Sequence, residues 1–201
     1  DKFGAKSAEK IQKFAFKHAG VETDRATYQA MEAFVHNLNT MHSRAGAQIP
    51  FSSINYGMDT TPEGRMVIKN VLLATEAGLG NGETPIFPIL IFKVKEGINL
   101  NKEDKNYDLF RLAMRVSSKR LFPNFSFLDA PFNIKYYQPD KPETEVVYMG
   151  CRTRVMGNVC GEEQAMGRGN LSFTTLNLPR LGIKYGIKTS DRNIADLDGF
   201  F

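Results

Sequence analysis

The sequence predicts an α/β fold with a mainly parallel sheet, and two observations lead to that prediction. Segments with helical periodicity alternate along the chain with short segments rich in β-forming residues. The segment 86–94 is almost continuously apolar, as is typical of a strand in a parallel sheet that helices cover. The 201 residues carry no internal repeat and no low-complexity tract, so we expect one domain.

Two helices are predicted before residue 46. The first covers 7–18, with Ser7 as its N-terminal cap and Gly20 as its end. The second covers 24–43, where apolar residues recur at spacings of three and four on one face. Such a stripe is typical of a core or of a helix–helix contact, and its periodicity does not separate these two roles.

Strands and helices then alternate. They are predicted at 50–56, 61–78, 86–94, 107–121 and 125–128. Thr61 is placed to cap the helix that Pro62 opens, and Gly78 is placed to end it. The glycine-rich segment 78–82 follows a helix and precedes a strand, the reverse of the order in a phosphate-binding loop, so we interpret it as a connection.

The last third of the chain is organised around a cysteine. The segment 135–145 has prolines and charges and is predicted to be a surface excursion, after which the apolar run 146–149 leads to Gly150 and Cys151. Two neighbouring strands joined by a loop, with a cysteine at the end of the first, are one way to hold a thiol inside a barrel-like core. Beyond it we expect an alternating strand at 171–178, its end at Pro179, and a helix capped at 190–191.

Composition excludes several classes of protein. The net charge of +4 is spread along the chain. Such a charge is typical of solvated faces, and the alternative is a weak attraction to nucleotides. No run of basic residues indicates a groove that binds nucleic acid. No run of about 18 apolar residues predicts a membrane span, and the first residues do not resemble a signal peptide, so we expect a cytoplasmic protein. Cys151 and Cys160 are too few for a disulfide scaffold, and with three histidines they form no metal-ligand pattern.

Several motifs, in one order, carry a family resemblance. They are the segments 34–46, 49–57, 82–88, 148–155 (Tyr-Met-Gly-Cys-Arg-Thr-Arg-Val) and 167–180. Together they resemble the catalytic core of the anaerobic (class III) ribonucleoside-triphosphate reductases, which are glycyl-radical enzymes. The resemblance implies part of a ten-stranded α/β barrel, with 1–46 as a helical dimer and effector region and 47–201 as barrel elements that include the cysteine loop. A chain this short does not close that barrel, so we expect an internal fragment, inactive alone.

The resemblance also assigns roles to individual residues. It makes Cys151 the thiyl radical that abstracts the 3′-hydrogen of the ribose, and it places Asn170 near that ribose. The further expected contacts to ribose or triphosphate are Ser52, Ser53, Asn55, Arg152 and Thr153. The residues alone leave other roles open. Cys151 is also consistent with an inert buried cysteine, and Asn170 with an asparagine in a turn. The polar residues of 52–55 are consistent with a solvent-facing side of a strand, and Arg152 with an exposed arginine at the rim of a barrel.

Cofactors and partners follow from the same resemblance. We expect no metal in this chain, and we expect the glycyl radical and a zinc site in a C-terminal part outside this sequence. The radical would be installed by an activating enzyme that uses S-adenosylmethionine (SAM) and an iron–sulfur cluster. The expected partners are ribonucleoside triphosphates, dNTP and ATP effectors and a second subunit, and neither nucleic acid nor a membrane. Two alternatives remain open: another glycyl-radical enzyme, acting on a small carbon acid or alcohol, and a non-catalytic nucleotide-binding module.

Overall fold

The structure is a computed structural model that describes residues 4–43, 45–139, 141–150, 153–158, 160–169 and 174–186. The chain forms two compact units, 1–166 and 167–201, which are described separately. The elements of the first unit are α1 (Ala5–Thr40), β1 (Ser53–Tyr56), α2 (Pro62–Ala77), β2 (Ile89–Val94), α3 (Tyr107–Arg120), β3 (Asn124–Phe127), α4 (Pro131–Ile134), a 3₁₀ turn (Pro142–Thr144), β4 (Val147–Met149) and β5 (Thr153–Val155). The described helix of the second unit is α5 (Leu178–Gly186).

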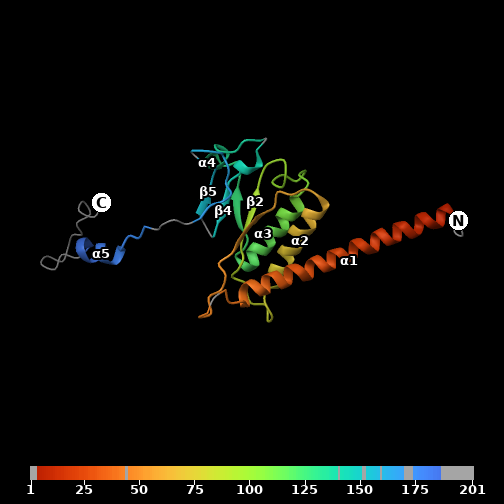
Figure 1. Ribbon diagram of the computed structural model, residues 1–201, viewed down its shortest axis with the longest axis horizontal. Helices are drawn as coiled ribbons and strands as arrows, with labels where there is room; N and C mark the ends of the chain where they lie inside the picture. Colours follow the sequence, from red (N-terminus) through yellow and green to blue (C-terminus); the bar gives the residue numbers. More distant parts are fainter. Residues whose placement is uncertain are drawn as a thin grey trace. The chain divides into compact units, whose positions relative to one another are not determined.

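A parallel sheet lies at the centre of the first unit, which confirms the predicted α/β class. Its strands run in the order β1-β2-β3, and each neighbouring pair is parallel. Helix α2 connects β1 to β2 and helix α3 connects β2 to β3, and the two helices pack against each other (Figure 1). Strand β2, buried along its whole length, is the predicted apolar strand with its start moved from residue 86 to residue 89.

One face of this sheet is apolar and carries the helices. Phe92 is fully buried at its centre and contacts the rings of Tyr56, Phe110 and Phe125. The buried residues of the same cluster are Ile68, Leu72, Val94, Leu109, Ala113 and Val116. Removal of this apolar area from water is the main driving force for assembly of the sheet and its two helices.

The opposite face of the sheet is partly polar. Side chains alternate between the two faces along a strand, and residues paired in register share a face. The register pairs Ser53 with Ile89, Asn55 with Ile91, and Lys93 with Ser126. Hydroxyl, amide and ammonium groups therefore lie on the face that α2 and α3 leave uncovered.

Helix α1 corrects the prediction of two separate helices. It continues through Gly20, and Ser7 lies inside it, because the N-terminal cap is Gly4 and makes no side-chain hydrogen bond. A glycine costs about 1 kcal/mol in a helix interior relative to alanine but does not terminate the helix by itself. The sequence has no proline nearby to force an end, so the 36-residue helix is unbroken.

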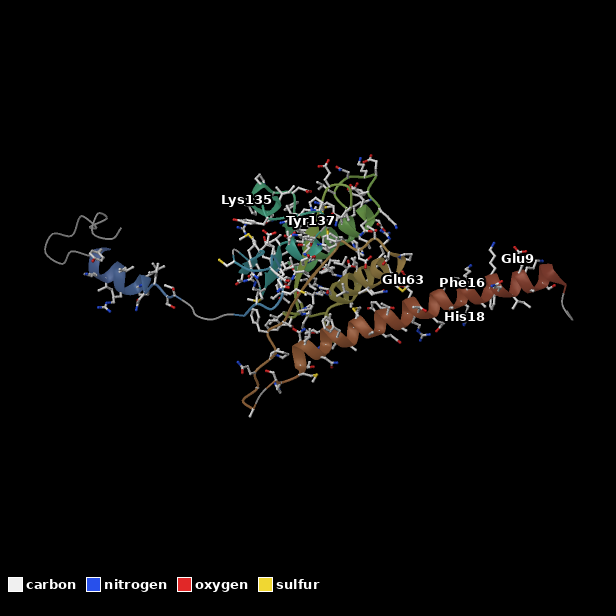
Figure 2. All side chains as sticks on the ribbon, turned by 45° about the horizontal axis from the view of Figure 1, so that its top comes forward. Glu9, Phe16, His18, Glu63, Lys135 and Tyr137 are labelled. Carbon is white, nitrogen blue, oxygen red and sulfur yellow. The ribbon has the colours of Figure 1, made fainter. Side chains whose placement is uncertain are left out.

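The two halves of α1 have different surroundings. In the C-terminal half, Val35 is buried and Asp24 forms an ion pair with Lys69 of α2 (2.6 Å). The N-terminal half extends past α2, and Phe16 and His18 are labelled along it in Figure 2. Its large apolar side chains Ile11, Phe14 and Phe16 are mostly exposed.

The ends of α2 confirm their sequence signals. The hydroxyl of Thr61 accepts a hydrogen bond from the Gly64 amide (3.1 Å), Pro62 is the first helical residue and Gly78 is the C-terminal cap. The sequence did not indicate that Arg120, at the end of α3, completes that cap. Its guanidinium donates to the carbonyl oxygens of Glu76, Ala77 and Gly82, and so satisfies groups that a helix end leaves free.

The predicted strand 171–178 is wrong over its described part. Residues 174–177 have no regular structure, and α5 begins at Leu178, so Pro179 is the second residue of a helix. The side chain of Asn177 accepts a hydrogen bond from the Arg180 amide (2.9 Å), as an N-terminal cap does. The alternation was thus misread, because an asparagine followed by a proline in the first turn indicates a helix start. Residues 171–173 and the predicted cap at 190–191 lie outside the described residues.

The other boundaries shift by a few residues. The predicted strand 50–56 is wrong at 50–52, since β1 begins at Ser53, and the third strand of the sheet lies at Asn124–Phe127. The excursion 135–145 holds the 3₁₀ turn and buries Thr144. In the ranges given above, no helix combines the length and the apolar character needed to cross a membrane.

Candidate functional site

The candidate site is the hairpin formed by β4 and β5. The two strands are antiparallel and pair Val147 with Val155 and Met149 with Thr153. The three residues between the last pair in sequence are Gly150, Cys151 and Arg152. Gly150 has φ of +61°, in the left-handed region that favours glycine, and Cys151 and Arg152 lie outside the described residues.

An asparagine side chain fastens β4 to β1. The Asn55 amide nitrogen donates to the Tyr148 carbonyl (2.8 Å), and the Asn55 amide oxygen accepts from the Tyr148 N–H (2.9 Å). One side-chain amide thereby satisfies both backbone groups of the residue in the middle of β4. Because both bonds come from one planar group, they fix the orientation of this peptide as well as its distance from β1.

Ser53 and Phe51 hold the next point along the hairpin. The Gly150 amide donates to the Ser53 hydroxyl oxygen (3.1 Å). A Cβ at position 150 would lie 3.1 Å from the ring of Phe51, closer than ordinary packing. The backbone of Gly150, directly before Cys151 in sequence, is therefore bonded to the Ser53 hydroxyl, and a larger residue at position 150 would crowd the Phe51 ring.

A buried ion pair holds the segment just before β4. The Lys93 ammonium on β2 contacts the Glu145 carboxylate, and the two side chains are 8% and 18% exposed. Lys93 is the only charged residue of its strand. Sequence reasoning missed both residues, although a single lysine within a buried apolar run was a usable signal, because a buried charge requires a partner.

A pocket of about 400 Å³ lies at the carboxyl end of β1. Its polar lining includes Asn55, Asp59, Lys93 and Glu145. Hydrogen bonds from the Thr61 amide and hydroxyl hold the pKa of the Asp59 carboxyl below its usual value. Burial raises the pKa of the Tyr56 phenol, whose hydroxyl has no partner among the described residues.

The residues predicted to form the site are brought together only in part. Ser53 and Asn55 form hydrogen bonds with Gly150 and Tyr148 of the hairpin. Ser52 precedes β1, and its buried hydroxyl has no partner in the described part of the chain. Thr153 is exposed at the first position of β5. The remaining predicted residues, Cys151, Arg152 and Asn170, lie outside the described residues.

Among the residues that the structure describes, no group of three or more His, Cys, Asp or Glu side chains is placed to hold a metal ion. Cys160 is exposed and unpaired to any other cysteine in the described ranges.

The fold and the hairpin define an α/β protein in which the segment directly before Cys151 in sequence is fastened to the polar face of a parallel sheet. Residues 1–198 match the sequence profile of the anaerobic ribonucleoside-triphosphate reductases. The chain therefore belongs to this family.

Curated relatives agree with that assignment. The anaerobic ribonucleoside-triphosphate reductase of Enterobacteria phage T4 is 39% identical over 178 residues, which are 87% of this chain and 28% of the relative. The enzyme of the same name from Escherichia coli K12 is 34% identical over 172 residues, 83% of this chain and 23% of the relative. That of Salmonella typhimurium LT2 is 33% identical with the same coverage. The chain thus spans about a quarter of the length of these relatives.

Proposed function

We propose that the protein to which this chain belongs reduces ribonucleoside triphosphates to deoxyribonucleoside triphosphates, with Cys151 as the thiyl residue. Family membership over 1–198 supports the reaction. The observation that carries the assignment of Cys151 is the fastening of Tyr148 and Gly150 to β1, immediately before it in the chain. A residue that must meet a substrate atom requires a backbone held in this way.

The proposed step is a hydrogen-atom transfer. The thiyl sulfur of Cys151 takes the 3′-hydrogen, so that the ribose C–H bond breaks, an S–H bond forms and the unpaired electron passes to C3′. The S–H and ribose C–H bonds are comparable in strength, so the step is nearly reversible. The C3′ radical activates loss of the 2′-hydroxyl as water. Two electrons and two protons come from a reductant, either formate or a thioredoxin-like or glutaredoxin-like dithiol, and Cys151 then returns its hydrogen to C3′.

The family cofactors are assigned to other parts of the whole protein. A glycyl radical, installed by a SAM and iron–sulfur activating enzyme, supplies the oxidising equivalent that makes Cys151 a thiyl radical. Among the described residues no cluster of ligands fits the family zinc, which we assign to another part of the whole protein. This chain contributes the cysteine, its supports and part of the substrate pocket.

The substrate contacts are proposed from the family resemblance. Asn170 orients the ribose hydroxyls, and Arg152 and Thr153 contact ribose or phosphate. Ser53 and Asn55 contact the ribose or the triphosphate from β1, and Ser52 does so from the residue before that strand. The bonds to β4 leave capacity for a substrate: the Ser53 hydroxyl can still donate, and the Asn55 amide keeps one donor and one acceptor site.

The larger assembly is also proposed. The parallel sheet supports its placement as part of a ten-stranded α/β barrel. The assignment of the enzyme to the cytoplasm follows from the family resemblance. The exposed Ile11, Phe14 and Phe16 on α1 support the assignment of residues 1–46 to a homodimer region that also binds dNTP and ATP effectors.

The test is reduction of CTP or ATP by the full-length protein after anaerobic activation, with and without Cys151→Ala. We expect the variant to lose all reduction while it keeps the electron paramagnetic resonance (EPR) signal of the glycyl radical. Reduction that survives the substitution would overturn the thiyl role. Nucleotide binding separates the alternatives, because a glycyl-radical enzyme for small carbon substrates would not bind the triphosphates, and a nucleotide-binding module would bind them without reducing them.

A further inference from the structure

The buried pair of Lys93 and Glu145 is unusual for the strand on which it lies. Strands of parallel sheets are normally apolar on both faces. Removal of two charges from water costs free energy, and their mutual attraction offsets this cost only when the geometry is favourable. Such a pair therefore contributes little to stability by itself. Another buried polar residue, Ser126, lies beside Lys93 in register and has no partner for its hydroxyl among the described residues.

The position of Glu145 in the chain indicates a role for the pair other than stability. Glu145 precedes β4 by two residues and Cys151 by six. From Glu145 to Gly150 the chain is fastened to the same face of the sheet at three points. Glu145 is held by β2, and Tyr148 and Gly150 are held by β1.

These three points act together on the backbone before the cysteine. A tie to one strand alone would leave β4 free to pivot about that strand. Ties to two neighbouring strands remove this freedom, and the double hydrogen bond of Asn55 selects Tyr148 and excludes its neighbours. A slip of one residue would break that bond and turn the side chains of β4 to the other side.

We propose that Lys93, Glu145 and Asn55 are positioning residues that set where Cys151 meets the ribose. The inference rests on the proposed function of Cys151. Hydrogen-atom transfer requires the reacting atoms at near-contact distance, and a misplacement of about 1 Å costs about a hundredfold in rate. The three residues act through the backbone of 145–150 and need not touch the substrate.

The decisive variant removes both charges at once. In the full-length protein, Lys93→Met and Glu145→Gln each leave one buried charge without its partner, so each is expected to lower both stability and turnover. The double variant Lys93→Met/Glu145→Met leaves no unpaired charge, so stability is expected to return. If the pair positions Cys151, turnover stays at least about tenfold below wild type, because methionine pairs supply no directional tie.

Three further measurements identify a positioning defect. KM for the triphosphate and the glycyl-radical EPR signal are expected to stay within about twofold of wild type, since neither depends on the placement of the thiol. With 3′-deuterated substrate, the isotope effect on kcat is expected to rise, because a misplaced thiol makes hydrogen transfer limiting. Asn55→Leu, which removes both bonds to Tyr148 at nearly constant volume, is expected to lower kcat and to raise the isotope effect in the same way, and it serves if the double variant does not fold. Its KM is not a criterion, because Asn55 is also proposed to contact the ribose.

Val116→Ala is the matched control. Val116 is fully buried on the helix face of the sheet, so the change destabilises the protein without contact with β4, and kcat is expected to be unchanged. The positioning role is overturned if the double variant recovers both wild-type kcat and stability and Asn55→Leu is also fully active. The proposed thiyl role of Cys151 would then be unaffected. Reduction by Cys151→Ala in the same series would instead overturn the proposed function, and with it this inference.

Discussion

The two faces of the parallel sheet are held by different interactions. On the helix face, the contacts come from burial of apolar side chains around Phe92, whose ring meets those of Tyr56 and Phe125. On the polar face, Asn55 bonds to both backbone groups of Tyr148, Ser53 accepts from the Gly150 amide, and Lys93 contacts the Glu145 carboxylate. Packing is tolerant of small shifts, whereas a hydrogen bond weakens steeply once its distance and angle change.

This difference suggests a division of labour between the faces. Apolar contacts supply most of the free energy that keeps β1, β2 and β3 together with α2 and α3. Directional contacts contribute little net stability, about 1 kcal/mol each, but they specify a position. Substitutions on the helix face should therefore change stability with little effect on kcat. Substitutions on the polar face that leave no charge without its partner should instead change kcat with little effect on stability.

Phe92→Ala is expected to have the largest effect. Phe92 is 0% exposed and its removal leaves a cavity among Tyr56, Phe110 and Phe125, so the protein should lose about 3–5 kcal/mol of unfolding free energy. The measurement is the urea midpoint and slope, with kcat determined per folded molecule. The matched control is Phe127→Ala on β3, since that ring is about half exposed and should cost less than about 1 kcal/mol. Equal losses for the two phenylalanines would contradict the helix-face core.

Ser53→Ala tests the weakest tie of the polar face. The change removes one acceptor for the Gly150 amide, which should cost about 1 kcal/mol and lower kcat about fivefold if that energy is lost from the transition state. Ser126→Ala is the control, because Ser126 lies on the same face with no partner for its hydroxyl among the described residues. Its kcat should equal that of wild type, and a matching decrease would refute the special role of Ser53.

Much of this fold was readable from the sequence. Local signals decided those parts: the apolar run of β2, the cap of α2 at Thr61 and Pro62, and the helical stripe that became the C-terminal half of α1. Each depends on residues close together in sequence, whose backbone preferences and burial act in the same direction. The same reasoning failed at Gly20 and at Pro179, where a single residue was given a terminating role that its neighbours did not support.

The supports of the candidate site were less accessible. Asn55 was singled out as a polar strand residue, but its partner Tyr148 lies 93 residues away, and nothing local in the sequence joins the two. Lys93 and Glu145 are separated by 52 residues, and only the chemical demand of a buried charge could have pointed to a partner. Asn39 of α1, which accepts from the amides of Ile86 and Phe87 ahead of β2, was missed for the same reason.

Asp24→Asn should give the smallest effect and concerns the contact of α1 with α2, on the helix side. Hydrogen bonds from Lys69 and Asn70 hold the pKa of the Asp24 carboxyl below its usual value of 3.8. The stabilisation is therefore fully present above the unfolded-state pKa and is lost as the pH falls through the lower folded-state pKa.

At pH 7 the Asp24→Asn variant should be less stable than wild type by less than about 1 kcal/mol, because the pair is more than a third exposed and solvent screens it. The difference should shrink as the pH is lowered past the carboxyl pKa, since wild type then loses the same charge. Urea midpoints measured between pH 7 and pH 3 test this, with Glu22→Gln, an exposed acid on the same helix, as the control for net charge. A gap that stayed constant across this range would show that Asn at position 24 disturbs packing rather than charge pairing. If kcat also fell, the contact of α1 with α2 would affect the hairpin as well. Stability and catalysis would then not be fully separated between the two faces of the sheet.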